Sequence, residues 1–150
     1  MSPHVRQLRE LVGAQLLVLP SVAVLPRDEQ GRVLLVRHAD NGQWGTVGGA
    51  VDPDEGPADA AVRECAEETG LTIALGTILA AVGGPSFRVT YDNGDKTSYV
   101  TIVYDARVTA GVPRPDGDET TECGWFRLEE LPGIDLGPIA RATFDALGWI

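Results

Sequence analysis

The sequence predicts an α/β fold. Three observations support this class: two Val- and Leu-rich segments near the N-terminus, a helical segment over 57–69, and further β-rich segments that precede a last helix over 138–147. Short β-rich segments bounded by turn signals favour strands, whereas apolar residues at three- and four-residue steps favour helices. The sequence has no internal repeats, and 150 residues suit one domain. We therefore expect one domain over residues 1–150.

The N-terminal part is predicted to form a helix followed by two strands. One apolar face predicts a short helix over 5–13. The segments 16–25 and 32–37 are rich in Val and Leu, and they flank 28–31, DEQG, which has the composition of a hairpin turn. His38 follows the second strand, and we interpret it as a loop residue, not as a metal ligand or a catalytic base.

A signal peptide is the alternative interpretation of the N-terminal segment. Arg6 and Arg9 precede an apolar run, but Glu10 lies beside them, and Gln15 and Pro20 interrupt the run. No run reaches the length of about 18 apolar residues that a membrane span needs. We expect neither secretion nor membrane insertion.

Charge and cysteine content restrict the partners of the protein. Its 22 acidic residues exceed its 12 Lys and Arg residues, which gives a net charge of -10. A nucleic-acid polymer is not expected as a partner, because phosphate backbones are bound by basic surfaces. A small anionic substrate stays possible, since bound divalent cations reverse the local sign of charge. Cys65 and Cys123 are too few for a disulfide framework, so we expect free thiols and a cytoplasmic protein.

The helix over 57–69 has recognisable ends. Pro57 suits the first turn, Asp54 and Glu55 can cap or complement its positive end, and Gly70 suits a left-handed C-terminal stop. Small side chains recur at helical steps and allow close packing on a sheet. This predicted buried stripe is Ala58, Ala61, Val62, Cys65 and Thr69.

Three glutamates gather on the same helix. Glu64 and Glu68 are one turn apart and Glu67 is their neighbour, so like charges repel by roughly 0.2–0.5 kcal/mol per pair. Arg63 is the only basic residue beside them. Hard oxygen ligands clustered in this way suit Mg²⁺ or Mn²⁺. The pattern therefore predicts a divalent-metal site.

The segment 49–71 resembles the Nudix box, G-x5-E-x7-R-E-U-x-E-E-x-G-U, in which U is a bulky apolar residue. The matching positions are Gly49, Glu55, Arg63, Glu64, Glu67, Glu68, Gly70 and Leu71. Cys65 occupies one U position, where a buried cysteine behaves as a small hydrophobe. Upstream, WGTVGG resembles the family's W-x-L-P-G-G, with Thr46 and Val47 in place of Leu and Pro.

The resemblance implies the Nudix fold, an α/β/α sandwich with a mixed central sheet and a loop-helix-loop box, in a MutT-like bacterial subgroup of undefined substrate. It implies Mg²⁺- or Mn²⁺-dependent hydrolysis of a nucleoside diphosphate linked to a group X, which gives a nucleoside monophosphate and phospho-X. It also implies roles for individual residues. Glu64 and Glu68 would be principal metal ligands, Glu67 a ligand or water-activating base, the Gly48 carbonyl a loop ligand, Glu55 a water-mediated ligand or a loop brace, and Arg63 the residue that orients the glutamates.

The segments after the box complete the predicted sheet. Residues 71–82 read as a strand with a weak break at Gly76, and 87–91 and 97–108 read as strands around the turn 92–95. Three tyrosines in or beside these strands are candidates for stacking on a base, although tyrosines in strands more often pack against neighbours. They are Tyr91, Tyr99 and Tyr104.

An acidic loop over 109–121 precedes the strand that contains Trp125 and Phe126, and a short helix is predicted over 128–132. In many Nudix enzymes an acid shortly before such a strand reaches the metal as an extra ligand or general base. The resemblance makes Glu119 the first candidate and Glu122 the alternative, while a solvated acidic loop explains either residue equally well.

The resemblance leaves the substrate open among ADP-ribose or a nucleotide sugar, (d)NTPs, and dinucleoside polyphosphates. Pro85 is a weak indication of the first, because some ADP-ribose-specific members carry a proline in that region. A nucleotide-binding sensor without catalysis is the alternative function, but such proteins generally lack glutamates of the box, and all are present here. The sequence neither requires nor excludes a homodimer.

Overall fold

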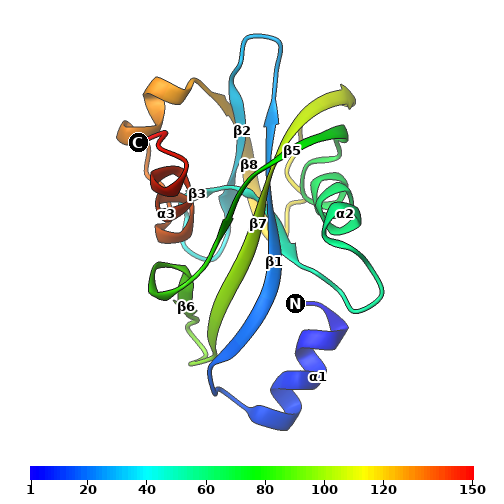
Figure 1. Ribbon diagram of the computed structural model, residues 1–150, viewed down its shortest axis with the longest axis vertical. Helices are drawn as coiled ribbons and strands as arrows, with labels where there is room; N and C mark the ends of the chain where they lie inside the picture. The colour runs from blue at the N-terminus through cyan, green and yellow to red at the C-terminus, as the bar shows by residue number, and fades with distance from the viewer.

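Two long parallel strands form the centre of the molecule. The computed structural model describes residues 1–150 and contains a mixed sheet of eight strands (Figure 1). Strand β1 (Leu17–Arg27) pairs in parallel with β7 (Lys96–Ala110) along its whole length. The expected mixed sheet is therefore confirmed.

The other strands extend the sheet on both sides of this pair. Antiparallel to β1 run β2 (Val33–His38) and β4 (Val47–Ala50), while β3 (Trp44–Gly45) and β8 (Thr120–Phe126) pair with β2. Antiparallel to β7 run β5 (Thr72–Val82) and β6 (Arg88–Thr90). The register of β5 shifts between Leu75 and Ile78, so the weak break predicted at Gly76 is a bulge.

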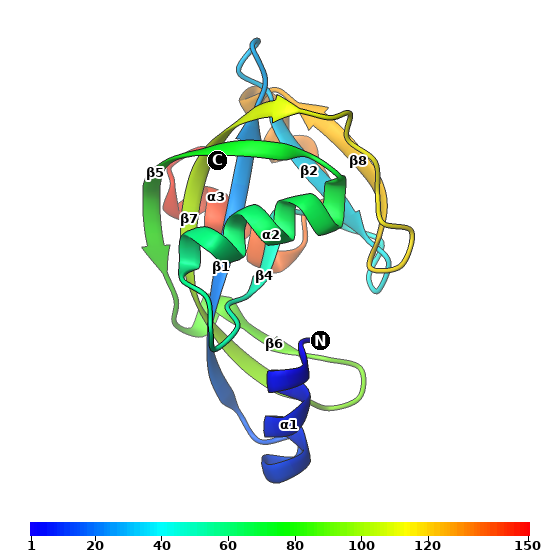
Figure 2. The same ribbon diagram turned by 90° about the vertical axis from the view of Figure 1, so that its right-hand side faces the viewer.

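Helices cover both faces of the sheet. Figures 1 and 2 show α2 (Pro57–Thr69) on one face and α3 (Pro138–Ala146) on the other. Successive residues of β1 point to opposite faces, so Val22 and Val24 join the core beneath α2, whereas Ala23 and Leu25 join the core beneath α3. Burial on both faces explains why β1 and β2 are continuous apolar segments and do not alternate with polar residues.

Most predicted elements are present with small differences at their ends. The box helix spans 57–69 as predicted, and Gly70 ends it in the left-handed conformation with φ 72°. Short 3-10 helices follow at Pro85–Phe87 and Leu128–Gly133. The loop after β7 is shorter than the predicted 109–121, because β7 continues to Ala110 and β8 begins at Thr120.

Two predictions about the box helix were wrong in part. Ala58 and Val62 are exposed, and the buried face is formed by Ala60, Ala61, Cys65, Glu68 and Thr69. The helix therefore directs Glu68 inward, a direction that hydrophobicity alone does not reveal. Neither Asp54 nor Glu55 caps the helix: Gly56 is the N-cap, and its amide donates to Asp59 Oδ2 at 3.3 Å.

Strands β3 and β4 were missed by the sequence analysis. Their residues include three glycines, which are depleted in strands and usually indicate loops. The partner strand decides the outcome here, because β1 offers an edge along which Val47–Ala50 pairs with Val24–Ser21.

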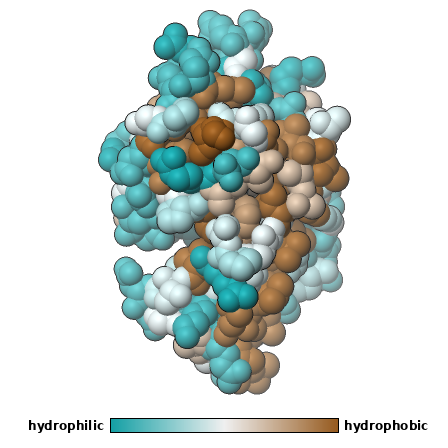
Figure 3. All heavy atoms as spheres, turned by 60° about the vertical axis from the view of Figure 1, so that its left-hand side comes forward, coloured by the Kyte–Doolittle hydropathy of each residue, from teal (hydrophilic) through white to brown (hydrophobic).

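Helix α1 (Pro3–Val12) extends from the lower end of the molecule (Figure 1). It begins two residues earlier than predicted, since Ser2 caps it by accepting a hydrogen bond from the Val5 amide at 3.2 Å. None of the helices combines the length and the apolar character needed to cross a bilayer. Figure 3 shows hydrophobic residues interspersed with hydrophilic ones on one face of the molecule. Ile78 and Val100 are among the exposed large apolar side chains of the protein.

Candidate active site

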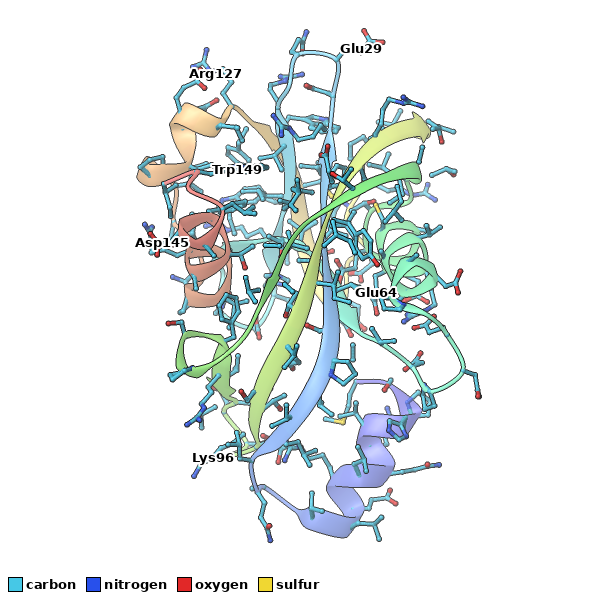
Figure 4. The ribbon with its side chains drawn as sticks, viewed as in Figure 1. Glu29, Glu64, Lys96, Arg127, Asp145 and Trp149 are labelled. Carbon is cyan, nitrogen blue, oxygen red and sulfur yellow. The ribbon has the colours of Figure 1, made fainter.

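The loop-helix-loop box depends on two glycines that allow backbone and carboxylate to approach each other. A Cβ on Gly48 would collide with the carbonyl oxygen of Val22 in β1, so only glycine permits this pairing of β4. A Cβ on Gly49 would lie 2.5 Å from Glu64 Oε1. Figure 4 places Glu64 between α2 and the sheet. The two glycines thus allow the carboxylates of α2 to lie close to the backbone of β4.

Glu68 is a buried carboxylate. Its residue is 5 % exposed, and its Oε2 accepts a hydrogen bond from the Gly48 amide at 3.1 Å. Burial raises the pKa of Glu68 to about 9, and the charges of Glu64 and Glu119 add to that rise. Ionised Glu68 is therefore unfavourable in the metal-free protein and becomes favourable when a cation binds beside it.

Arg63 is the centre of a network of carboxylates. Its guanidinium donates to Glu55 at 3.0 and 2.5 Å and to Glu64 Oε1 at 3.0 Å. It also donates to Glu67 Oε2 and to the Ala50 carbonyl, each at 3.3 Å. One side chain thus joins the loop before α2 to two glutamates on α2, in the arrangement expected of a residue that orients them.

The carboxylates around Arg63 differ in their electrostatics. The hydrogen bond from Arg63 lowers the pKa of Glu55, and Glu55 also accepts from the Asp52 amide at 3.0 Å. Burial raises the pKa of Glu64 to about 7 even though Arg63 opposes the rise. Glu67 is 59 % exposed and faces solvent. Glu55 therefore braces the loop, whereas Glu64 and Glu67, each paired with Arg63, line a cleft.

That cleft has a volume of about 910 Å³. Its walls include Glu64, Glu67 and Glu119, and the charge of Glu119 acts on both Glu64 and Glu68. Glu122 instead pairs with Arg37 at 3.2 Å on the exposed surface and does not line the cleft. The geometry therefore favours Glu119 over Glu122 as the downstream acid, while its catalytic role stays a prediction.

The residues of the box fit a divalent cation by their chemistry. Every side chain that would hold it offers carboxylate oxygen, the ligand preferred by Mg²⁺ and Mn²⁺. Glu68 is buried and Glu64 half-buried, and burial raises the pKa of both carboxyl groups, so a cation beside them would favour their ionised forms. The acidic side chains do not form a compact ligand cluster in this arrangement, and Arg63 pairs with Glu64 and Glu67 at 3.0 and 3.3 Å.

Several residues of the cleft were not identified from the sequence. His38, interpreted as a loop residue, lies at the end of β2 and lines the cleft, where burial lowers its pKa. Arg9 reaches the cleft from α1, and no sequence motif indicates this contact. Tyr91 and Tyr99 also line it, but Tyr104 is only 7 % exposed and belongs to the core. The candidate role of Tyr104 in base stacking was therefore wrong.

Comparison with known proteins identifies the family. The model of the NUDIX domain family matches residues 18–147. The chain belongs to the Nudix family. Among proteins similar to this Nudix hydrolase is a MutT-like protein of Streptomyces ambofaciens, 32% identical over 127 residues that cover 85% of this chain and 75% of that protein. A nucleoside triphosphatase NudI of Salmonella agona is 32% identical over 126 residues, covering 79% of this chain and 89% of the relative.

Solved structures agree with this membership. The MutT protein from Methanosarcina mazei Go1 superposes with a TM-score of 0.72 at 31% identity, covering 87% of this chain and 93% of that one. A MutT Nudix hydrolase from Burkholderia pseudomallei gives a TM-score of 0.68 at 30% identity, covering 89% and 98% of the two chains. The protein is thus a MutT-like Nudix hydrolase, an enzyme of the pyrophosphohydrolase class.

Proposed function

We propose that this Nudix hydrolase is a Mg²⁺- or Mn²⁺-dependent enzyme that cleaves a nucleoside diphosphate linked to X into a nucleoside monophosphate and phospho-X. The observation that carries the proposal is one cleft lined by Glu64, Glu67 and Glu119, with the buried Glu68, whose pKa is raised, hydrogen-bonded to Gly48 in the wall of that cleft. Such a site binds a phosphate anion only if cations first reverse its charge. Acidic side chains that hold divalent cations beside the phosphates are one means of catalysing phosphoryl transfer.

Each residue has a proposed part in the reaction. Glu64 and Glu68, with the Gly48 carbonyl, would hold the metal, and Glu55 would brace the loop or bind the metal through water. A bound divalent cation lowers the pKa of attacking water and neutralises charge on the phosphates. Glu67 or Glu119 would accept the proton of that water, since both line the cleft. Arg63 would keep Glu64 and Glu67 oriented, because it donates to both.

Nucleoside triphosphates are the first substrate class to examine. Two relatives above 30% identity are named for such activity: the nucleoside triphosphatase NudI of Salmonella agona and a putative 8-oxo-dGTP diphosphatase of Bacillus subtilis. The structures of an ADP-ribose pyrophosphatase from Streptococcus suis and of a UDP-X diphosphatase share the fold, at 26% and 19% identity. ADP-ribose and nucleotide sugars therefore remain the second class.

The test is product chromatography with (d)NTPs, 8-oxo-dGTP, ADP-ribose, nucleotide sugars and diadenosine polyphosphates, each with Mg²⁺, with Mn²⁺ and with EDTA. We expect metal-dependent release of a nucleoside monophosphate. Glu68→Gln should reduce turnover at least ~10²-fold, the scale carried by carboxylate acid–base or ligand roles. Near-normal turnover in this variant would show that the metal site does not include Glu68. Nucleotide binding without any metal-dependent turnover would favour a sensor instead.

A further inference from the structure

Helix α1 lies opposite the box across the cleft but packs weakly on the rest of the protein. Figure 2 shows it below α2 and beside the β6–β7 hairpin. None of its residues is buried, and Leu11 is 83 % exposed. Nevertheless Val5 and Arg9 contribute to the wall of the cleft. Hydrophobic packing therefore does not explain how this part of the wall is held in place.

Arg9 attaches α1 to the sheet. Its Nη2 donates to the Lys96 carbonyl at 2.6 Å and to Thr97 Oγ1 at 2.9 Å, both at the start of β7. Its Nε lies 3.6 Å from Asp95 Oδ2, and its Nη1 donates to the Gln15 carbonyl at 2.7 Å. The Arg9 side chain is only 9 % exposed. Arg9 thus joins α1, the segment that follows it and the β6–β7 turn through charge-assisted hydrogen bonds.

The turn that Arg9 holds is itself well ordered by hydrogen bonds. The Tyr91 amide donates to the Asp95 carbonyl at 2.9 Å, and Asn93 Nδ2 donates to Asp95 Oδ2 at 3.1 Å. Tyr91 and Tyr99 are linked through their hydroxyl groups. Tyr91 at this turn and Tyr99 on β7 therefore line the cleft from defined positions, and Arg9 fixes α1 against the same turn.

This side of the cleft has a chemistry unlike that of the box. It offers Tyr91, Tyr99, Val5 and Thr97, while its two cations are paired, Arg9 with Asp95 and the Met1 ammonium with Glu119 at 3.8 Å. Neither cation is left unpaired to bind a phosphate, and the facing box is acidic. Aromatic side chains bind bases by stacking, and neutral polar groups suit a sugar. A neutral nucleoside fits this wall, whereas the phosphates fit the metal side.

We propose that α1 and the β6–β7 hairpin, clamped together by Arg9, form the wall that binds the nucleoside of the substrate. This inference rests on the proposed function, because it specifies the other end of the same site. Arg9 acts as a positioning residue: it does not contact the reacting atoms but holds the wall that does contact the nucleoside. Substrates that place a nucleoside here should gain affinity that an inorganic polyphosphate does not.

The experiment compares wild type with Arg9→Ala, using dGTP, ADP-ribose and inorganic tripolyphosphate as probes in Mg²⁺. Arg6→Ala is the matched control, because Arg6 carries the same charge on the same helix but is exposed and does not line the cleft. Affinity is measured by calorimetry, KM and kcat by product chromatography, and the mobility of α1 by hydrogen exchange. Tyr91→Ala provides a second variant that removes a wall side chain and leaves the Arg9 clamp intact.

We expect Arg9→Ala to increase exchange over residues 3–16 and to weaken nucleotide binding about tenfold, with KM raised, kcat within about threefold and tripolyphosphate affinity unchanged. Tyr91→Ala should weaken nucleotide binding by a similar factor without increasing hydrogen exchange in α1. Arg6→Ala should match wild type in both measurements. Unchanged nucleotide affinity in Arg9→Ala, or an equal loss of affinity for tripolyphosphate, would overturn the inference. Arg9-dependent binding without turnover would instead overturn the proposed function and leave the nucleoside wall in place.

Discussion

Replacing Glu68 with glutamine should stabilise the metal-free protein while it impairs catalysis. Glu68 is a residue only 5 % exposed, and its carboxyl accepts one hydrogen bond, from the Gly48 amide. Glutamine has nearly the same shape, and its carbonyl oxygen accepts the same hydrogen bond, but it carries no charge to desolvate. The variant therefore keeps the packing of α2 and removes the ionisation that burial opposes.

The magnitude follows from the pKa. Burial raises the pKa of Glu68 from 4.5 to about 9, so between these values the unfolded chain releases a proton that the folded protein retains. The contribution of Glu68 to the free energy of unfolding is fully present below pH 4.5 and is lost as the pH rises through about 9. At pH 7 the loss amounts to about 3 kcal/mol, from ~1.4 kcal/mol per pH unit. That corresponds to a Tm difference of roughly 6–12 °C for a domain of this size.

Thermal unfolding of wild type and Glu68→Gln in EDTA, measured from pH 4.5 to 8.5, tests this reasoning. The two Tm values should agree near pH 4.5 and separate as pH rises, with the variant more stable. Glu64 titrates in both proteins, so the difference between the curves isolates Glu68. Curves that stay parallel over this range would refute the idea that burial penalises ionised Glu68. Far-UV circular dichroism checks that the two folds agree.

Four further predictions follow from the site. Mg²⁺ should raise the Tm of wild type more at pH 8 than at pH 6, because protons compete with the cation for the buried carboxylates; an equal rise at both values would argue against these ligands. Arg63→Lys should lower kcat at least tenfold despite the retained charge, since an ammonium cannot reproduce the forked contacts to several carboxylates; wild-type rates would show that orientation is unimportant. In steady-state assays Glu119→Gln should reduce kcat about ten- to a hundredfold and Glu122→Gln less than twofold, and the reverse order would exchange their roles. Gly49→Ala should weaken Mg²⁺ binding in calorimetry, because the added methyl meets the Glu64 carboxylate at 2.5 Å; unchanged affinity would contradict that placement.

The sequence by itself determined the family, the box helix and most of the sheet. Local rules were sufficient for these elements: Pro57 and Gly70 define the ends of the helix, and the spacing of Arg63, Glu64, Glu67 and Glu68 is readable without coordinates. Each of these signals depends on residues close together in the chain. For that reason the bounds of the helix agree with the prediction.

Only the tertiary structure decided which way the helix faces and what lies across the cleft. Glu68 is buried because the sheet pairs β4 with β1 and brings Gly48 beneath α2. Arg9 joins Thr97 across 88 residues, and Tyr104 points into the core while Tyr99 lines the cleft. These outcomes depend on long-range pairing and on packing between distant segments, which no local pattern of residues specifies.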